Sequence, residues 1–257
     1  VGFILWLRLS AEEQKQWHAA AVQAAQKLGD KYAHALALGS YALALLDQGS
    51  LAEAKKFLEQ ARMIFSSLDD HRHDDELDSL EGLLLKAQGQ HRAAIACFSR
   101  SIASAERKKD DKLRGHDLCN MGLAYVELNE LDTAIDIFRC SVEASQLAHN
   151  PHGQSNALSA LGGAYRKKRD LEQAIDALRW SLKLRREISY EDGIRPLLGE
   201  LGDVLIRRGR KDDLEEALTL FREQIHRLRG RTSQLAKGSH VAALGGISTC
   251  NILLRRF

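Results

Sequence analysis

The residues with the greatest capacity for chemistry stand together between Asp69 and Asp75. Four carboxylates and two imidazoles occur in this run of seven, and such groups can chelate a divalent metal ion. Arg72 stands in the middle of the run, and a structural metal site needs about four well-placed ligands. We therefore expect a solvated loop here and no metal site.

No other group of residues indicates catalysis. The chain has no GxxxxGK[ST] phosphate loop, no HExxH and no GxSxG. His149 and His152 flank Asn150-Pro151, which is typical of a turn. The four cysteines form no CxxC pair, so we expect reduced thiols on helices. The sequence predicts a protein that is no enzyme and that needs no cofactor.

A period of 40 residues organises the chain. The turn positions follow it without a slip: Gly49, Gly89, Asn129, Arg169 and Gly209. A small position follows it too: Gly82, Gly122, Gly162 and Gly202. So does a series of alanines: Ala54, Ala94, Ala134 and Ala174. A repeat of this size is typical of a solenoid, in which each unit packs only on its neighbours.

Residues 113–147 show one repeat most clearly. Its first helix has an apolar face with helical spacing: Leu118, Met121, Gly122 and Tyr125. Asn129 tolerates the left-handed conformation that ends a helix. The second helix follows, with Ala134 and Phe138 on its inner face. We expect the small residue Gly122 to let the two helices approach closely, because a bulky side chain there would wedge them apart.

This pattern resembles the tetratricopeptide repeat family. The marks of that family are carried here by Gly122, Tyr125, Asn129, Ala134, Phe138 and Ser141. The period is 40 residues instead of about 34, which predicts a longer second helix and loop. Long repeats of this kind are similar to those of kinesin light chains and of bacterial regulators that carry a signal-transduction ATPase. The resemblance implies an all-α, right-handed superhelical solenoid of antiparallel helix pairs.

We expect three segments along the chain. Residues 1–30 would hold a truncated first repeat, mainly its second helix, with Gly2 and Leu9 in the small and turn positions of the first. Residues 31–231 would form an array of five repeats, and residues 232–257 a partial repeat or a capping helix. Gly245, 43 residues after Gly202, would take the small position there. We therefore expect a fragment of a longer protein.

The resemblance implies that the first helix of each repeat lines a concave groove for a ligand. The predicted groove residues are Ser40, Leu43, Leu80, Leu83, Asn120, Leu123, Ala160, Gly163, Arg166, Lys167, Glu200, Asp203 and Arg207. Lys86 and Glu127 lie further along the same helices. The groove would be apolar in its first half and charged in its second. Alternatively, the leucines pack against adjacent helices.

Basic residues form another candidate surface. Arg166-Lys167-Lys168-Arg169 and Arg207-Arg208-Gly209-Arg210-Lys211 occupy the same turn of successive repeats, so stacking would make them a basic ridge. Residues 1–165 carry 17 basic and 22 acidic side chains, a balance of −5, and residues 166–257 carry 20 and 13, a balance of +7. Such a ridge would attract phosphates. No aromatic residues interleave with it to stack bases.

The sequence therefore predicts a non-catalytic scaffold that binds a protein or peptide ligand in the groove, as part of a larger signalling or regulatory protein. Two alternatives stay open. One is the sensor arm of an ATPase-linked (STAND-type) regulator, and the other is nucleic-acid binding through the basic ridge. We expect a cytoplasmic protein with no membrane partner, because the apolar run Val1–Leu7 is shorter than the roughly 20 residues of a membrane span. Intramolecular contacts with domains outside this sequence are also expected.

Overall fold

The computed structural model describes residues 10–228 and 234–257, and these residues form α-helices joined by short turns, with no strand among them. The positions of Gly2 and Leu9 lie outside the described residues. The helices are α2 (Ala11–Leu28), α3 (Lys31–Asp47), α4 (Leu51–Ser67), α5 (Asp74–Ala87), α6 (His91–Lys108), α7 (Asp111–Glu127), α8 (Leu131–Leu147), α9 (Pro151–Lys167), α10 (Leu171–Glu187), α11 (Glu191–Arg208), α12 (Lys211–Leu228) and α13 (Gln234–Leu254).

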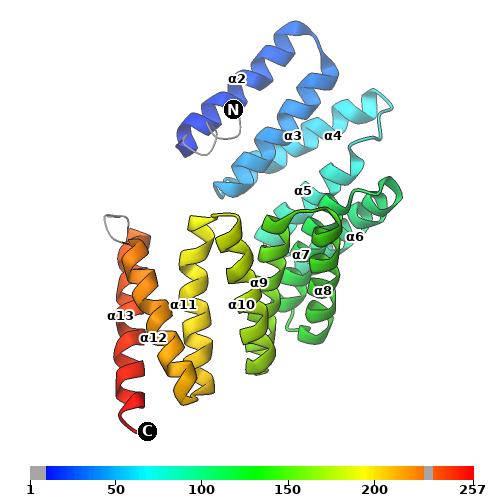
Figure 1. Cartoon of the computed structure of the whole chain (residues 1–257). Helices are drawn as coiled ribbons and strands as arrows, with labels where there is room; N and C mark the ends of the chain where they lie inside the picture. The colour runs from blue at the N-terminus through cyan, green and yellow to red at the C-terminus, as the bar shows by residue number, and fades with distance from the viewer. Residues whose placement is uncertain (1–9, 229–233) are drawn as a thin grey trace. The chain divides into compact units, whose positions relative to one another are not determined.

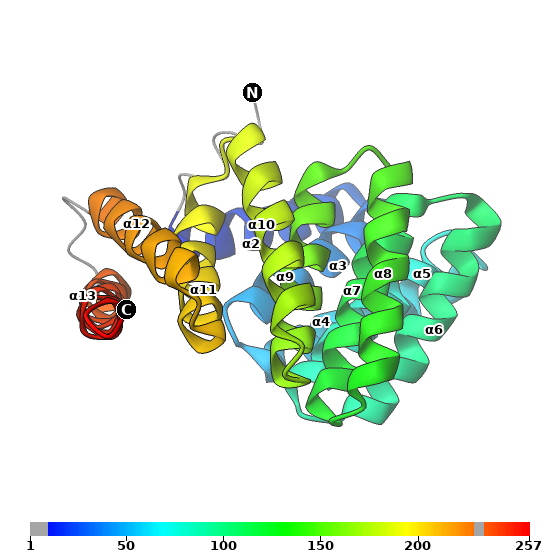
Figure 2. The same cartoon turned by 60° about the horizontal axis from the view of Figure 1, so that its bottom comes forward.

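The helices are divided between two compact units, the first ending at Leu128 and the second beginning at Asn129. In the first unit each helix from α2 to α7 packs beside the next one in the chain (Figure 1). The helix α5 also touches α3 on one side and α7 on the other, so these alternate helices form a common layer. In the second unit α8 to α13 pack in the same consecutive way, and α11 also touches α13 (Figure 2).

Left-handed residues end the helices at a regular interval. The predicted turn positions all have positive φ: Gly49 at 76°, Gly89 at 75°, Asn129 at 61°, Arg169 at 66° and Gly209 at 75°. A second series lies midway between them: Gly29 at 70°, Asp69 at 52°, Lys109 at 57°, His149 at 48° and Ser189 at 54°. The sequence indicates a loop from Asp69 and a turn at His149, but not the regular spacing of this second series, because only its first member is glycine, the residue that adopts this conformation without strain.

The small residues of the first helices permit close packing, as predicted. A Cβ atom at Gly82 would lie 2.6 Å from the ring of Phe98, and one at Gly202 would lie 2.6 Å from the ring of Phe221. At Gly162 the distance to Leu178 would be 2.7 Å. Contacts this short do not occur between real carbon atoms, so a larger residue at any of these crossings would force the facing side chain to shift. The same role for Gly122 stays a prediction.

The last helix uses a different face from the one that the repeat phase indicates. α13 packs against α12 and α11, and it is Gly246 whose Cβ would lie 2.5 Å from the Phe221 ring. Nothing lies within 4 Å of a Cβ at Gly245. Val241 and Leu244 are 69% and 50% exposed. The small position of α13 is therefore Gly246, 44 residues after Gly202, and the prediction of Gly245 is wrong.

Candidate functional site

A cavity of about 300 Å³ lies in the first unit, where α3, α5 and α7 form their common layer. Four of the predicted groove residues line it: Ser40 and Leu43 from α3, and Leu80 and Leu83 from α5. The spacing of the repeat explains the arrangement, because Leu43 and Leu83 occupy the same position one period apart. The register thus brings equivalent side chains of neighbouring first helices to one cavity.

The floor of the cavity is apolar and densely packed. Ala35, Phe65 and Leu77 line it and are almost completely buried. Leu80 and Leu83 are half-buried at its wall, and Leu43 remains 42% exposed. Part of each leucine thus packs on neighbouring helices and part faces open space. A Cβ at Gly39, which also lines the cavity, would make only ordinary contact with Leu80, at 4.0 Å from Cδ1.

Polar groups fix the end of the cavity at which α5 begins. His73 Nε2 lies 2.8 Å from the Tyr32 hydroxyl, and its Nδ1 lies 3.2 Å from Glu76 Oε2. The His73 ring also packs against Phe65, with 5.2 Å between the ring centroids. His73, Phe65 and Glu76 all line the cavity. This end therefore presents an anchored imidazole and an exposed carboxylate.

Lys86 on α5 and Asn120 on α7 lie beyond the opposite end of the cavity, three and four residues after the lining residues Leu83 and His116. Lys86 Nζ donates a hydrogen bond of 2.5 Å to Asn120 Oδ1, and Asn120 Nδ2 donates one of 3.1 Å to the carbonyl oxygen of His116, which lines the cavity. Burial lowers the pKa of the Lys86 ammonium group. Among the described residues, Lys86 forms no ion pair with a carboxylate. Leu123, also on α7, is 37% exposed.

In the second unit the predicted groove residues have a different character. Ala160 and Gly163 on α9 are small and half-buried. Arg166 Nη2 lies 3.7 Å from Glu200 Oε1, so one ion pair joins the predicted residues of α9 and α11. Burial raises the pKa of Glu200. The other predicted members are exposed: Lys167, Asp203 and Arg207.

Sequence reasoning missed Arg185, which is deeply buried next to this surface. Its side chain is 7% exposed, with Nη1 donating to the carbonyl oxygen of Gly193 at 2.6 Å and Nη2 to Asn156 Oδ1 at 3.2 Å. Burial lowers the pKa of its guanidinium group. An arginine near the end of an amphipathic helix is ordinarily solvated. The burial of Arg185 becomes evident only from its contacts with Asn156 on α9 and Gly193 on α11.

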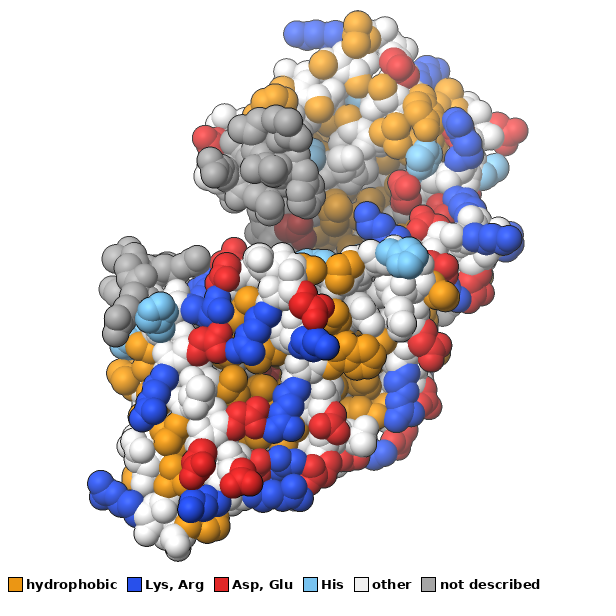
Figure 3. All heavy atoms as spheres, in the orientation of Figure 1, with side chains coloured by type: hydrophobic (Ala, Val, Ile, Leu, Met, Phe, Trp, Pro, Cys, Tyr) orange, Lys and Arg blue, Asp and Glu red, His pale blue; other side chains and the backbone are white. Residues whose placement is uncertain are grey.

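Part of the basic ridge is paired with carboxylates. Lys168 pairs with Asp132, and Glu172 accepts from both Arg208 and Arg210. On the face that Figure 3 shows, positive and negative side chains alternate over the second unit and form no patch of one sign. Pairing of this kind weakens the attraction for phosphates that the bare sequence suggests.

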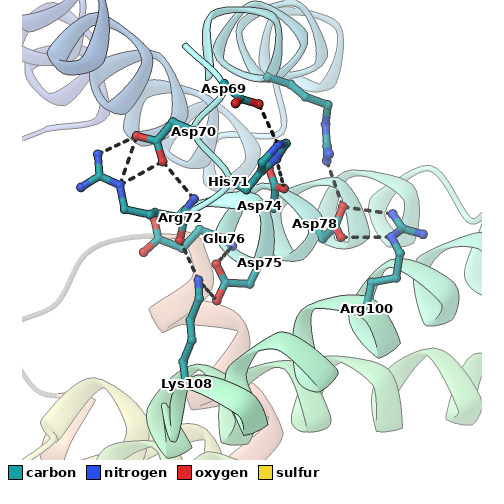
Figure 4. Close-up of polar contacts among 11 residues, drawn as sticks. Asp69, Asp70, His71, Arg72, Asp74, Asp75, Glu76, Asp78, Arg100 and Lys108 are labelled. Carbon is teal, nitrogen blue, oxygen red and sulfur yellow. Dashed lines mark hydrogen bonds and ion pairs between the residues drawn. The ribbon is translucent and has the colours of Figure 1, made fainter. Parts of the chain in front are cut away.

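The charged side chains between Asp69 and Asp75 pair with one another and with Lys108 (Figure 4). Asp70 accepts from Arg72 at 2.6 and 3.0 Å, and this hydrogen bonding lowers the pKa of the Asp70 carboxyl. Asp75 accepts from Lys108 at 2.7 Å, and His71 Nδ1 lies 2.9 Å from Asp74 Oδ2. Within the described residues, no three His, Cys, Asp or Glu side chains are grouped to hold a metal ion.

Comparison with known proteins identifies the repeats. A family model described as tetratricopeptide repeat matches residues 76–146 and 118–187. This stretch has the 40-residue spacing, the left-handed turns and the glycine crossings described above, and it belongs to the tetratricopeptide repeat family. No curated protein matches the chain significantly. In the part of the chain that the structure describes, no helix is both long and apolar enough to cross a membrane.

Several solved structures share the fold. One is a signal transduction ATPase with numerous domains (STAND) from Pyrococcus horikoshii, which has a tetratricopeptide repeat sensor. It is similar over 92% of this chain and 38% of its own, with 12% identity and a TM-score of 0.72. The apo form of the quorum sensor NprR from B. thuringiensis is similar over 87% of this chain and 62% of its own, with 18% identity and a TM-score of 0.71.

A further structure, NprR in complex with its cognate peptide NprX, covers 95% of this chain and 68% of its own, with 17% identity and a TM-score of 0.59. At such identities the likeness establishes the fold, an all-α helical-repeat array. The chain thus spans less than two thirds of the STAND protein and of the apo NprR chain.

Proposed function

We propose that this chain is a non-catalytic scaffold that binds a protein or peptide segment through the layer of α3, α5 and α7. The observation that carries the proposal is the 300 Å³ cavity in that layer, with predicted groove leucines on its wall. A pocket that exposes apolar side chains over a buried apolar floor gains free energy when a ligand covers it. Burying one leucine-sized side chain contributes roughly 1.5–3 kcal/mol.

The likeness to NprR supports a peptide as the ligand, since that protein has been solved with a cognate peptide bound. We extend the proposal to a signalling role in a longer protein, because the chain is similar to only part of the STAND and NprR chains. The cysteines Cys97, Cys119, Cys140 and Cys250, all in the described part of the chain, form no disulfide, which suits the reducing cytoplasm.

A second candidate function is the sensor arm of a STAND-type regulator. The likeness to the P. horikoshii protein favours it. A nucleotide-binding domain encoded in the same gene would support this role, and a gene without one would exclude it. Nucleic-acid binding through the basic ridge is the weaker alternative, because Lys168, Arg208 and Arg210 are already paired with carboxylates.

Selection from a peptide library tests the proposal. A phage-displayed library of random dodecapeptides is selected on the purified chain and counter-selected on the Leu43→Glu/Leu83→Glu double variant. We expect peptides that bind the parent chain and are lost on the variant, because two carboxylates at the cavity wall would have to be desolvated by an apolar ligand. Far-UV circular dichroism checks that the variant keeps its helix content. Peptides that bind both proteins equally, or no enrichment at all, would exclude this site.

A further inference from the structure

We infer that the ligand is an amphipathic segment, which inserts a large apolar side chain into the cavity and places a carboxylate on Lys86. The inference rests on the proposed function and specifies the chemistry of the ligand. Its two parts come from different observations, the apolar lining of the cavity and the unusual surroundings of one lysine.

The size and lining of the cavity indicate that the ligand inserts an apolar side chain. A volume of about 300 Å³ is at the lower end of the range of ligand pockets, roughly 300–1,000 Å³, and suits a side chain better than a whole cofactor. Leu80 and Leu83 form its wall above the buried floor of Phe65 and Leu77. A leucine, methionine or phenylalanine side chain would complete this packing, whereas a charged one would lose its hydration there.

The surroundings of Lys86 indicate that the ligand carries an acidic group. It follows Leu83 by one helical turn on α5, a rise of about 4.5 Å, so both side chains are within reach of one short segment. The ammonium group is half-buried, and its hydrogen-bond partner is the neutral amide of Asn120. Asn120 is held in turn by the His116 carbonyl, so its Oδ1 stays directed at Lys86. A half-buried cation without a counter-ion is stabilised when a ligand supplies an anion.

The charges at the two ends of the cavity also give the ligand a direction. Glu76, near the start of α5, is an exposed carboxylate at one end, and Lys86 lies ten residues later, about 15 Å along the helix. A carboxylate is repelled by Glu76 and attracted by Lys86. The acidic group of the ligand therefore lies toward the end of α5, and its apolar side chain lies between the two charges.

A charge reversal tests this inference. The dodecapeptide library is selected in parallel on the parent chain, on Lys86→Glu, and on Lys56→Glu, a matched reversal of an exposed lysine of α4 outside the cavity. We expect the parent and Lys56→Glu to enrich a large apolar residue close to Asp or Glu. We expect Lys86→Glu to enrich the same apolar residue close to Lys or Arg.

A synthetic peptide from the parent selection then gives the size of the effect. Lys86→Gln, which removes the positive charge and keeps a polar side chain, should weaken its binding about ten-fold or more. Replacing the acidic residue of the peptide by its amide should weaken binding to the parent chain and leave binding to Lys86→Gln unchanged, because the two changes remove the same ion pair.

The outcomes separate this inference from the function on which it rests. Peptides that require Leu43 and Leu83 but show no acidic preference, or keep one motif on Lys86→Glu, would overturn the ion pair and leave the scaffold function standing. A preference for basic residues on the parent chain would overturn it as well, in favour of Glu76. Absence of any peptide that depends on the two leucines would overturn the proposed function, and the inference with it.

Discussion

Replacing Gly162 by alanine should destabilise the second unit, whereas the same replacement at the adjacent Gly163 should stabilise it. Both glycines lie in the interior of α9, so each variant gains the same helix propensity, about 1 kcal/mol relative to glycine. The two variants differ in what the added methyl group meets. Comparing the two variants therefore separates the effect of the close crossing of α9 and α10 on stability from the effect of helix propensity.

The distances give the expected magnitudes. A Cβ at Gly162 would lie 2.7 Å from both Cγ and Cδ2 of Leu178, a fully buried residue, and 3.3 Å from the backbone oxygen of Ala174. Overpacking of this kind costs about 1–3 kcal/mol, which leaves a net loss of roughly 0–2 kcal/mol after the propensity gain. A Cβ at Gly163 has Glu200 Oε1 as its nearest neighbour, at 3.7 Å, so its gain of up to about 1 kcal/mol remains.

Urea unfolding followed by far-UV circular dichroism measures both free energies of unfolding, and hydrogen exchange in α9 and α10 localises the change. The expected separation between the two variants is about 1–3 kcal/mol, with Gly162→Ala the less stable. If the two variants unfold within about 0.5 kcal/mol of each other, the glycine is not what sets the approach of these helices.

Three further substitutions test other parts of the structure. Asp78→Asn should cost about 2 kcal/mol in urea unfolding, because it weakens the hydrogen bonds that two arginines donate to this nearly buried carboxylate; an unchanged midpoint would show that the bonds are not formed in solution. Arg169→Gly should raise the melting temperature, with a gain of up to about 1 kcal/mol, because φ is +66° there; a lower melting temperature would contradict the left-handed turn. Hydrogen bonds from Arg208 lower the pKa of Asp213, so the stability that they contribute is complete above the unfolded value of about 3.9 and is lost as the pH falls through the folded value. Stability below about pH 4 should consequently fall more steeply in the parent chain than in Asp213→Asn, and parallel pH profiles would refute the pairing.

The period of the sequence predicted the fold because the same packing problem recurs in every repeat. Small residues recur where the two helices of a repeat approach closely, which is why Gly82 and Gly202 indicated these crossings in advance. One series of turns was predicted because glycine recurs in it every 40 residues, and the period assigned Arg169 to it. Lys109 and Ser189 adopt the same left-handed conformation without a glycine or a turn motif, so the 20-residue interval of the turns was not predicted.

The candidate site was predictable to the extent that it depends on register. Leu43 and Leu83 could be assigned to one surface because they share a position in successive repeats. The burial of Arg185 could not, since it depends on Asn156 and Gly193 in two other helices. The tight hydrogen bond of Lys86 to Asn120 likewise joins residues 34 positions apart, which is not the period of the repeat.

The measurement that tests the central claim most directly is the affinity of a selected peptide for Leu83→Glu, read by fluorescence anisotropy. Met63→Glu is the matched control, because Met63 is 71% exposed on α4 and does not line the cavity. We predict at least a ten-fold loss of affinity for Leu83→Glu, since the cavity wall would then carry a charge, and no change for Met63→Glu. Retained affinity in Leu83→Glu, or an equal loss in both variants with helix content intact, would contradict binding in the layer of α3, α5 and α7.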